Sequence, residues 1–467
     1  MAMVLFLNRG SFQPEDIHIS DSHITEDTLV TFVDFIPGVV ERTCSAAMSH
    51  GAVKYHSYRS LIEMANKWLQ RNPEWKVFNC ETVLLLYKYN DIKNCNELRP
   101  NDCCFYISGS ERTNVLKGLR LWIKLRKRSI RRHGSCEYQE LNYTDLVPEI
   151  DEKGAFAKLH DLIEQANILI RKEEIQGRII SVETVTYEAN TDWKIDPDAT
   201  LSALSTKKLF ILRIFYEEGL PLQEEIDIID FVPRHLSGGG FFKRPKFESY
   251  TDVMSRASHW LSQNRHLNYR NAQSIDIKLS IKSLTSVNTK NMYFTDYGSY
   301  IRIFRVCCTK SSRILDRSSA QSNRVISPIH LSSRLFLPVR KKDSIGAIRE
   351  RFEDWIFNAT QEANELDIIS EFKTNRRLRV LSAETICMFC KSDDESLEES
   401  IEEPFHYNRF GAKNGFIFMI FRFYFDFSND TIGSINGSII KQSSSLEKLI
   451  EKVYPDKTIG SQTCIVM

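Results

Sequence analysis

Four stretches of the sequence carry the same amphipathic pattern, and this repetition constrains the fold more than any other feature. In residues 58–69, apolar side chains recur at i, i+3, i+4, i+7, i+10 and i+11, which form one face of an α-helix. The same spacing recurs at 159–170, 250–261 and 345–356, with Arg349 as a departure in the fourth stretch. The sequence therefore predicts four helices of one kind.

The segments on either side of each predicted helix repeat as well. An extended segment that ends in proline precedes each helix, and these prolines are Pro37, Pro148, Pro233 and Pro338. Proline offers no N–H to a β-ladder and disfavours helix in the residue before it, so it is expected to end a strand. Two further strand-like segments follow each helix. The repeating unit is therefore predicted to be strand, helix, strand, strand.

This unit predicts an α+β fold of four tandem modules, each an antiparallel sheet covered on one face by one amphipathic helix. The expected boundaries are a lead-in at 1–28, module 1 at 29–128, module 2 at 136–218, module 3 at 222–310, module 4 at 328–430, and a C-terminal segment at 431–467. The modules are too long for a solenoid, whose repeats have about 20 to 50 residues. Strand–helix–strand–strand units occur in many unrelated folds, so this architecture by itself implies no activity.

The strand after each predicted helix carries a polar residue at one repeated position: Glu81, Glu183, Gln273 and Glu384. By alternation this residue lies at the end of the core-facing side of the strand. It could be a carboxylate site in each module, acting as a catalytic acid or a metal ligand. It could instead hydrogen-bond the backbone where helix and sheet meet. The second interpretation is favoured, because glutamine cannot act as a general acid or base.

The last strand of each module carries an arginine with an aromatic residue two positions later. These pairs are Arg120 with Trp122, Arg213 with Phe215, Arg302 with Phe304, and Arg422 with Tyr424. Alternation predicts that they lie on the outer face of the sheet, opposite the core. Such a face could stack nucleobases, or one module could pack on another through it, with cation–π contacts. Packing is favoured, because four modules in one chain must bury surface somewhere.

The balance of charge limits the kind of partner. The chain has 62 Lys and Arg against 61 Asp and Glu, a formal net charge of +1, so binding to a polyanion would depend on local patches. The densest basic run is the predicted basic patch, which consists of Lys124, Arg126, Lys127, Arg128, Arg131 and Arg132. Most such runs are solvated turns, but this one is dense enough to face the phosphates of anionic lipid or nucleic acid.

Known catalytic motifs are missing from the sequence. There is no phosphate-binding loop, no G-x-S-x-G, no H-E-x-x-H and no G-x-G-x-x-G. The one C-x-x-C, Cys387 to Cys390, has no second pair to complete a zinc site. The sequence thus predicts no cofactor, no metal and no enzymatic activity. An enzyme with a site between modules, around a repeated glutamate, is the third alternative.

The last four residues, Cys464 to Met467, match the C-a-a-X prenylation pattern, with a terminal methionine that favours farnesyl. The alternative is a cysteine that simply lies near the end of the chain. The lipid interpretation is favoured, because residues 456–462 before it are polar and contain glycine and serine. One prenyl chain holds a protein at a membrane only marginally, so the basic patch is the expected second signal.

The leading hypothesis is a non-enzymatic, cytoplasmic interaction scaffold held at a membrane surface by a prenyl group on Cys464 and by the basic patch. Its protein partner is not identified by the sequence. The second hypothesis is a nucleic-acid-binding repeat protein that uses the arginine and aromatic faces together with the basic patch.

Overall fold

The computed structural model describes the following segments of the chain, and the fold is that of these residues. They are residues 3–5, 29–43, 52–88, 100–107, 113–126, 138–203, 205–238, 245–279, 287–295, 298–311, 328–339, 343–369, 378–390, 396–408 and 415–426. Among these residues, strands account for 50% and helices for 22%. The fold is mixed α+β and its sheets are mostly antiparallel, as the sequence predicted.

Four long helices lie at the four amphipathic stretches. They are α1 (Tyr58–Arg71), α2 (Leu159–Arg171), α3 (Tyr250–Gln263) and α4 (Ile345–Ile369). Ser57 and Ser249 cap α1 and α3, because each hydroxyl accepts a hydrogen bond from a backbone N–H in the first helical turn. A short helix, α5 (Leu397–Glu402), lies near the end of the described chain. None of the described helices is long and apolar enough to cross a membrane.

Most strands belong to four sheets. Sheet 1 contains β1 (Met3–Leu5), β2 (Val30–Ile36), β5 (Trp75–Lys88), β7 (Thr113–Leu125) and β10 (Leu201–Ala203). Sheet 2 contains β8 (Leu141–Leu146), β9 (Gly177–Glu188), β11 (Lys207–Glu218) and β16 (Tyr293–Thr295). Sheet 3 contains β12 (Glu224–Phe231), β15 (Asn268–Lys278), β17 (Gly298–Ser311) and β20 (Phe405–Asn408). Sheet 4 contains β6 (Cys104–Ile107), β18 (Leu331–Phe336), β19 (Arg379–Cys390) and β21 (Gly415–Asp426).

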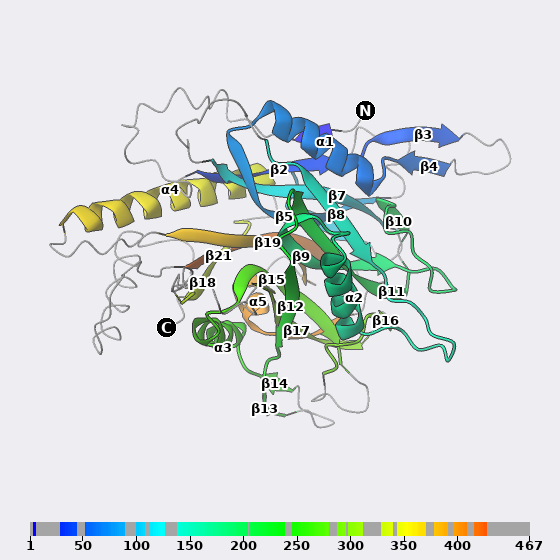
Figure 1. Ribbon diagram of the computed structural model, residues 1–467. Helices are drawn as coiled ribbons and strands as arrows, with labels where there is room; N and C mark the ends of the chain where they lie inside the picture. The colour runs from blue at the N-terminus through cyan, green and yellow to red at the C-terminus, as the bar shows by residue number, and fades with distance from the viewer. Residues whose placement is uncertain are drawn as a thin grey trace, which may run out of the picture.

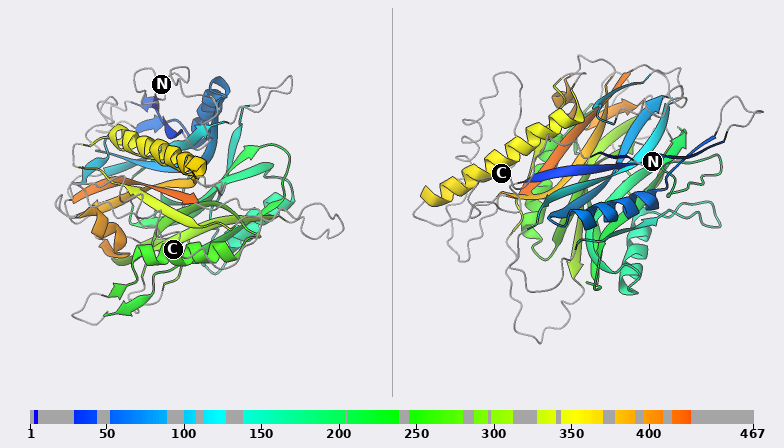
Figure 2. Two further views of the ribbon diagram at one scale, coloured as in Figure 1. Left: turned by 90° about the vertical axis from the view of Figure 1, so that its left-hand side faces the viewer. Right: turned by 90° about the horizontal axis from the view of Figure 1, so that it is seen from above.

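Two hairpins project from this body, as Figures 1 and 2 show. One is β3 (Val39–Thr43) with β4 (Ala52–Tyr55), and the other is β13 (His235–Ser237) with β14 (Lys246–Phe247).

Each sheet includes one short strand that comes from another stretch of the chain. The strand β10 pairs with β7, β16 pairs with β11, and β20 pairs with β17, so each of sheets 1 to 3 takes a strand from the stretch that follows it. The strand β6, from early in the chain, pairs with β21 in sheet 4. Sheets 1 to 4 are therefore linked in a closed cycle, and residues 104–107 leave the first predicted module to complete the last sheet.

Each long helix lies between two sheets. The helix α1 packs on Leu119 and Leu121 of sheet 1 and also on Tyr143 and Phe215 of sheet 2. In the same way α2 lies between sheets 2 and 3, α3 between sheets 3 and 4, and α4 between sheets 4 and 1. The expectation of a helix on one face of each sheet is therefore incomplete, because the neighbouring helix covers the second face. Figure 1 shows the four helices around a central group of strands.

The start of each long helix is held by a residue from another stretch of the chain. The first N–H groups of a helix have no acceptor within the helix, and here a neighbouring segment supplies one. The acceptors are Asp198 for α1, Lys290 for α2 and Asn101 for α4, which lie in loops, and the carboxylate of Glu402, at the end of α5, for α3. The contact at α4 again joins the early part of the chain to the last long helix.

Candidate functional site

The strands β5, β9, β15 and β19 meet at the centre of the molecule, each in contact with the next, and β19 is also in contact with β5. They carry the repeated polar position of the sequence. We refer to the hydrogen bonds among these four strands as the polar ring.

Each repeated polar side chain accepts a hydrogen bond from a backbone N–H on a neighbouring strand. The donors and acceptors are Thr82 to Glu183 (3.0 Å), Thr184 to Gln273 (2.8 Å), Ser274 to Glu384 (2.6 Å) and Thr385 to Glu81. The last bond closes the ring between residues 304 positions apart in the sequence. These side chains thus bond backbone, as the favoured interpretation expected, but the backbone belongs to the adjacent sheet.

An arginine completes each of the four contacts by donating its Nη1 to the hydroxyl of the same threonine or serine. The pairs are Arg120 with Thr385 (2.8 Å), Arg213 with Thr82 (3.1 Å), Arg305 with Thr184 (2.8 Å) and Arg422 with Ser274 (2.8 Å). Every contact between adjacent sheets in the ring therefore contains an arginine, a hydroxyl residue and a glutamate or glutamine.

In the third sheet the ring arginine is Arg305, whereas the sequence comparison selected Arg302. Arg305 lies opposite Gln273 in the strand register, as Arg120 lies opposite Glu81. Arg302 lies opposite Asp276 and forms an ion pair with it at 3.0 Å. The prediction was shifted by three residues, because β17 carries arginines on both of its faces.

The arginine and aromatic pairs were expected on the face opposite the core, with packing between modules as the favoured interpretation, and the structure buries this face. The side chains of Arg120, Trp122, Arg213, Phe215, Arg302, Phe304, Arg422 and Tyr424 are all buried. Glu81 and Arg120 are register partners, so they share a face, contrary to the expectation that arginine and glutamate lie on opposite faces. Strand alternation separates two faces, but it cannot tell a solvent face from a second face covered by a neighbouring helix.

Three ring arginines are also held by an aspartate on the strand of their own sheet that precedes the proline, which is β2, β8 or β12. The guanidinium binds each carboxylate through Nε and Nη2, at 2.6 to 2.8 Å, in the pairs Arg120 with Asp34, Arg213 with Asp145, and Arg305 with Asp230. Sequence reasoning missed this set. Its signal was the aspartate three residues before each of Pro37, Pro148 and Pro233.

In the fourth sheet this aspartate is replaced by Leu335, which lies opposite Arg422. The Nε of Arg422 is buried and has no hydrogen-bond partner among the described residues. The nearest carboxylate is that of Glu384, 3.4 Å from Arg422 Nη1. Glu384 thus acts as the counter-ion of Arg422.

The balance of buried charge therefore differs around the ring. In sheets 1 and 2 an aspartate already neutralises the arginine, so the charges of Glu81 and Glu183 are in excess. Burial raises the pKa of Glu81 to about 7. Burial, and then the nearby charge of Glu81, raises the pKa of Glu183 to about 8. In sheet 3 the neutral Gln273 occupies this position, and in sheet 4 Arg422 balances Glu384.

The predicted basic patch falls only partly within the described residues. Lys124 is buried, and its ammonium lies 5.8 Å from the centre of the Phe78 ring, so it does not belong to a surface patch. It is buried because β7 continues as a paired strand through this position. Arg126 is half-buried. The other four members, Lys127, Arg128, Arg131 and Arg132, and the tail with Cys464, lie outside the described residues.

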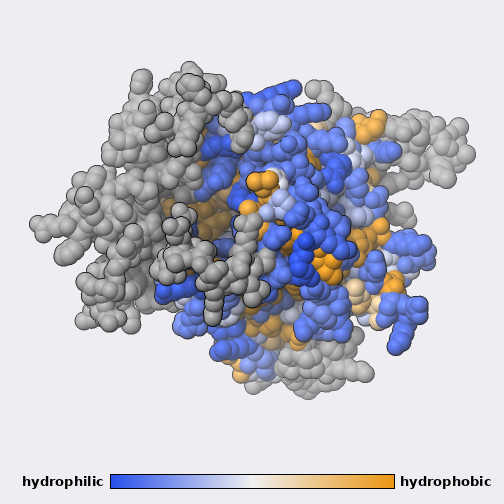
Figure 3. Space-filling model, in the orientation of Figure 1, coloured by the Kyte–Doolittle hydropathy of each residue, from blue (hydrophilic) through white to orange (hydrophobic). Residues whose placement is uncertain are grey.

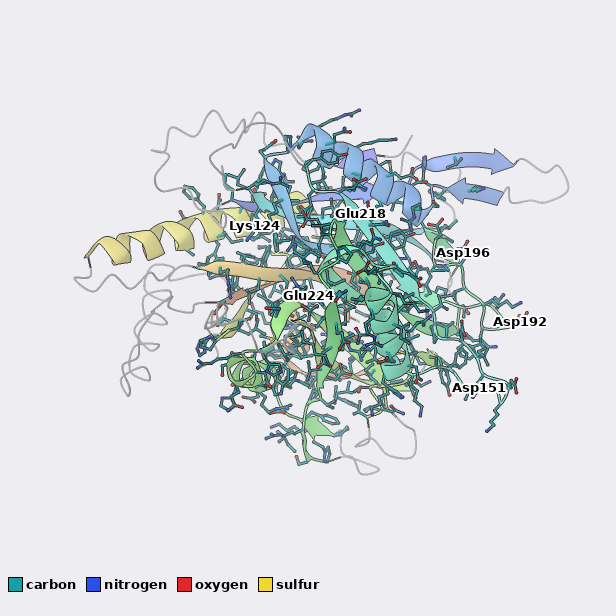
Figure 4. The ribbon with its side chains drawn as sticks, viewed as in Figure 1. Lys124, Asp151, Asp192, Asp196, Glu218 and Glu224 are labelled. Carbon is teal, nitrogen blue, oxygen red and sulfur yellow. The ribbon has the colours of Figure 1, made fainter. Side chains whose placement is uncertain are left out.

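Metal-binding clusters do not occur within the described segments: no three His, Cys, Asp or Glu residues gather there. Cys387 is exposed and Cys390 is buried, so the C-x-x-C does not present both thiols to one site. Asp151, Asp192 and Asp196 lie on loops at the periphery in Figure 4, away from the polar ring.

Comparisons with protein-family models, curated proteins and solved structures find no match to this chain.

Proposed function

We propose that the protein is a non-enzymatic interaction scaffold in which four copies of one strand–helix–strand–strand module close into a ring. The observation that carries this proposal is the polar ring. The same arginine, hydroxyl and glutamate or glutamine recur in equivalent register at all four contacts between sheets. A closed ring of this kind supplies a rigid body that presents its loops and hairpins to partners.

The same contacts weigh against the two alternatives. An enzyme centred on a repeated glutamate would need a carboxylate available to substrate, but Glu183 accepts both the N–H and the hydroxyl of Thr82. Nucleic-acid binding through arginine and aromatic faces would need those faces exposed, whereas Arg213 and Phe215 are each 0% exposed. The face of the molecule seen in Figure 3 is mostly hydrophilic, with scattered apolar areas.

In this proposal Cys464 carries a farnesyl group that attaches the ring to a membrane surface. A single prenyl chain gives marginal binding, so a second signal is required. Arg126, Lys127, Arg128, Arg131 and Arg132 supply it, at about 1 kcal/mol for each basic residue near anionic lipid. Lys124 is left out of this set because its side chain is buried.

Replacing Cys464 by serine tests the membrane part of the proposal. In eukaryotic cells fed a farnesyl analogue, the wild type should be labelled and recovered with membranes, and Cys464→Ser should lose both the label and the recovery. Cys387→Ser is the matched control, because Cys387 is an exposed cysteine outside the tail; it should keep both. Neutralising the five basic residues should reduce recovery while the label persists. A wild type that takes up no label would refute the lipid assignment.

A further inference from the structure

In sheets 2 and 3, an asparagine side chain covers the outer edge of the strand that precedes the proline, which is β8 in sheet 2 and β12 in sheet 3. Asn66 of α1 donates to the carbonyl of Leu141 at 2.9 Å and accepts from its N–H at 2.8 Å. Asn167 of α2 forms the same pair of bonds with Ile226, at 3.1 and 2.7 Å. A side-chain amide in this position takes the place of a neighbouring strand, and thereby protects an edge that would otherwise accept another chain.

In sheets 3 and 4, an arginine side chain covers the other end of the equivalent edge, just after β12 and β18. Arg256 of α3 donates to the carbonyl of Val232 at 2.7 Å. Arg351 of α4 donates to the carbonyl of Leu337 at 2.9 Å. Both carbonyls belong to the residue immediately before the strand-ending proline.

The strand β2 has neither kind of side chain at the equivalent positions. Glu353 of α4 stands where Asn66 and Asn167 stand in their helices, and it accepts a hydrogen bond from the hydroxyl of Thr31. An ionised carboxylate has no N–H to give to a strand carbonyl. Met64 of α1 stands where α3 and α4 carry Arg256 and Arg351, and a thioether is not a donor.

Main chain closes this edge instead. The strand β1 pairs antiparallel with the end of β2, with Met3 opposite Ile36 and Leu5 opposite Asp34. Ile36 is the residue before Pro37, which is the position that Arg256 and Arg351 serve in sheets 3 and 4. A strand therefore occupies the place that a side chain occupies elsewhere.

We propose that the outer edge of β2 at 34–36 is a docking site for an extended, apolar segment of a protein partner, and that β1 is a built-in occupant which this segment displaces. Addition of a strand to a sheet edge is a common mode of peptide recognition, in which main-chain hydrogen bonds give affinity. The sequence of β1 consists of three apolar residues, and it defines the chemistry of the partner strand. The inference rests on the proposed scaffold role, but it does not require the lipid at Cys464.

The built-in strand is a weak competitor. Within the described part of the chain, three residues of β1 pair with β2, so a partner segment that pairs over more residues can replace β1. Disrupting β1 should therefore increase the affinity of the edge for an added peptide.

The test is the binding of a fluorescent peptide with the sequence of residues 1–9 and a lysine tail, measured by anisotropy on the full chain. The variant Leu5→Pro removes the N–H of the β1 residue that lies opposite Asp34, and should bind the peptide about tenfold more tightly than the wild type. Leu5→Ala, which keeps the N–H, is the matched control and should bind like the wild type. A peptide N-methylated at its Met3 and Leu5 positions lacks both N–H groups that face β2, and should not bind.

Equal affinity of the wild type and Leu5→Pro for the peptide would overturn the inference, and so would tight binding of the N-methylated peptide. A second measurement does not depend on the stability of the variant. In the wild type, excess peptide should change the hydrogen exchange of the Asp34 and Ile36 amides, and unchanged exchange would also count against the docking site. Neither result bears on labelling at Cys464, so the two proposals fail separately.

Discussion

Replacing Glu384 by glutamine should lower the free energy of unfolding by about 3 kcal/mol, because it removes the counter-ion of a buried arginine. Arg422 is 1% exposed, and Leu335 stands where the other sheets supply an aspartate. The same substitution at Glu81 or Glu183 leaves the arginine paired with Asp34 or Asp145. Gln273 shows that an amide can accept the ring hydrogen bond. Glu81→Gln and Glu183→Gln should therefore lose little stability near neutral pH.

The dependence on pH separates the glutamates further. The folded-state pKa values of Glu81, about 7, and Glu183, about 8, lie above the usual glutamate value of about 4.3. The native state therefore holds these protons over a range in which the unfolded chain has released them, and stability should fall as the pH rises from about 5 to about 8. Glu81→Gln and Glu183→Gln remove this loss, so each should gain stability relative to the wild type as the pH rises.

Urea denaturation of the three variants at pH 5 and pH 8 checks both statements. Glu384→Gln should have the lowest free energy of unfolding of the three variants at both pH values. From pH 5 to pH 8, the free energy of unfolding of Glu183→Gln should rise relative to that of the wild type. Three variants with equal stability and parallel pH profiles would show that the buried charges are not balanced as described.

Replacing Asp230 by leucine should be the most damaging change at the aspartate positions, at about 3–5 kcal/mol, the cost of breaking a buried ion pair by removing one partner. Arg305 is 3% exposed, and Asp230 is bound to both its Nε and its Nη2. Because the ring position of sheet 3 holds Gln273, no ring carboxylate can take over. Arg305 would be left as an uncompensated buried charge.

Asp145→Leu is the matched control for this prediction. It gives sheet 2 the arrangement of sheet 4, with a leucine, an arginine and a glutamate. Glu183 can then neutralise Arg213, so the loss should be less than half that of Asp230→Leu. The double variant Asp230→Leu/Gln273→Glu builds the same arrangement in sheet 3 and should recover much of the lost stability. Equal losses of unfolding free energy in Asp145→Leu and Asp230→Leu, measured by urea denaturation, would contradict the pairing of Glu183 with Arg213.

The helices were predictable because their signal is local. An apolar face at helical spacing needs no knowledge of its partner, and the first three stretches were located within a few residues of their observed ends. In α4 the helix runs on to Ile369, well beyond the predicted end, since that end was copied from the other three stretches. The polar position on β5, β9, β15 and β19 was found for the same reason, by comparison of short segments.

The closure of the ring was not predictable from such patterns. The contact between Thr385 and Glu81 joins residues 304 positions apart, and the paired strand β6 has only four residues. A strand that short has no periodicity to detect. The burial of Trp122 also depends on α4, a helix from the far end of the chain. Charge pairing was the one accessible signal that went unused, in the aspartates before three prolines and Leu335 before the fourth.

The central claim is that the last sheet closes onto the first, and a disulfide across this junction tests it most directly. Phe105 of β6 and Ile417 of β21 are register partners. Opposed residues of antiparallel strands have Cα atoms about 4.5–5.5 Å apart, within the range of a disulfide. In the variant Phe105→Cys/Ile417→Cys, the account predicts an intrachain bond between these two positions, found by peptide mass mapping of the oxidised monomer. It also predicts that this bond raises the denaturation midpoint above those of the single variants. A folded monomer in which both cysteines stay reduced, or link only between molecules, would contradict the closed ring.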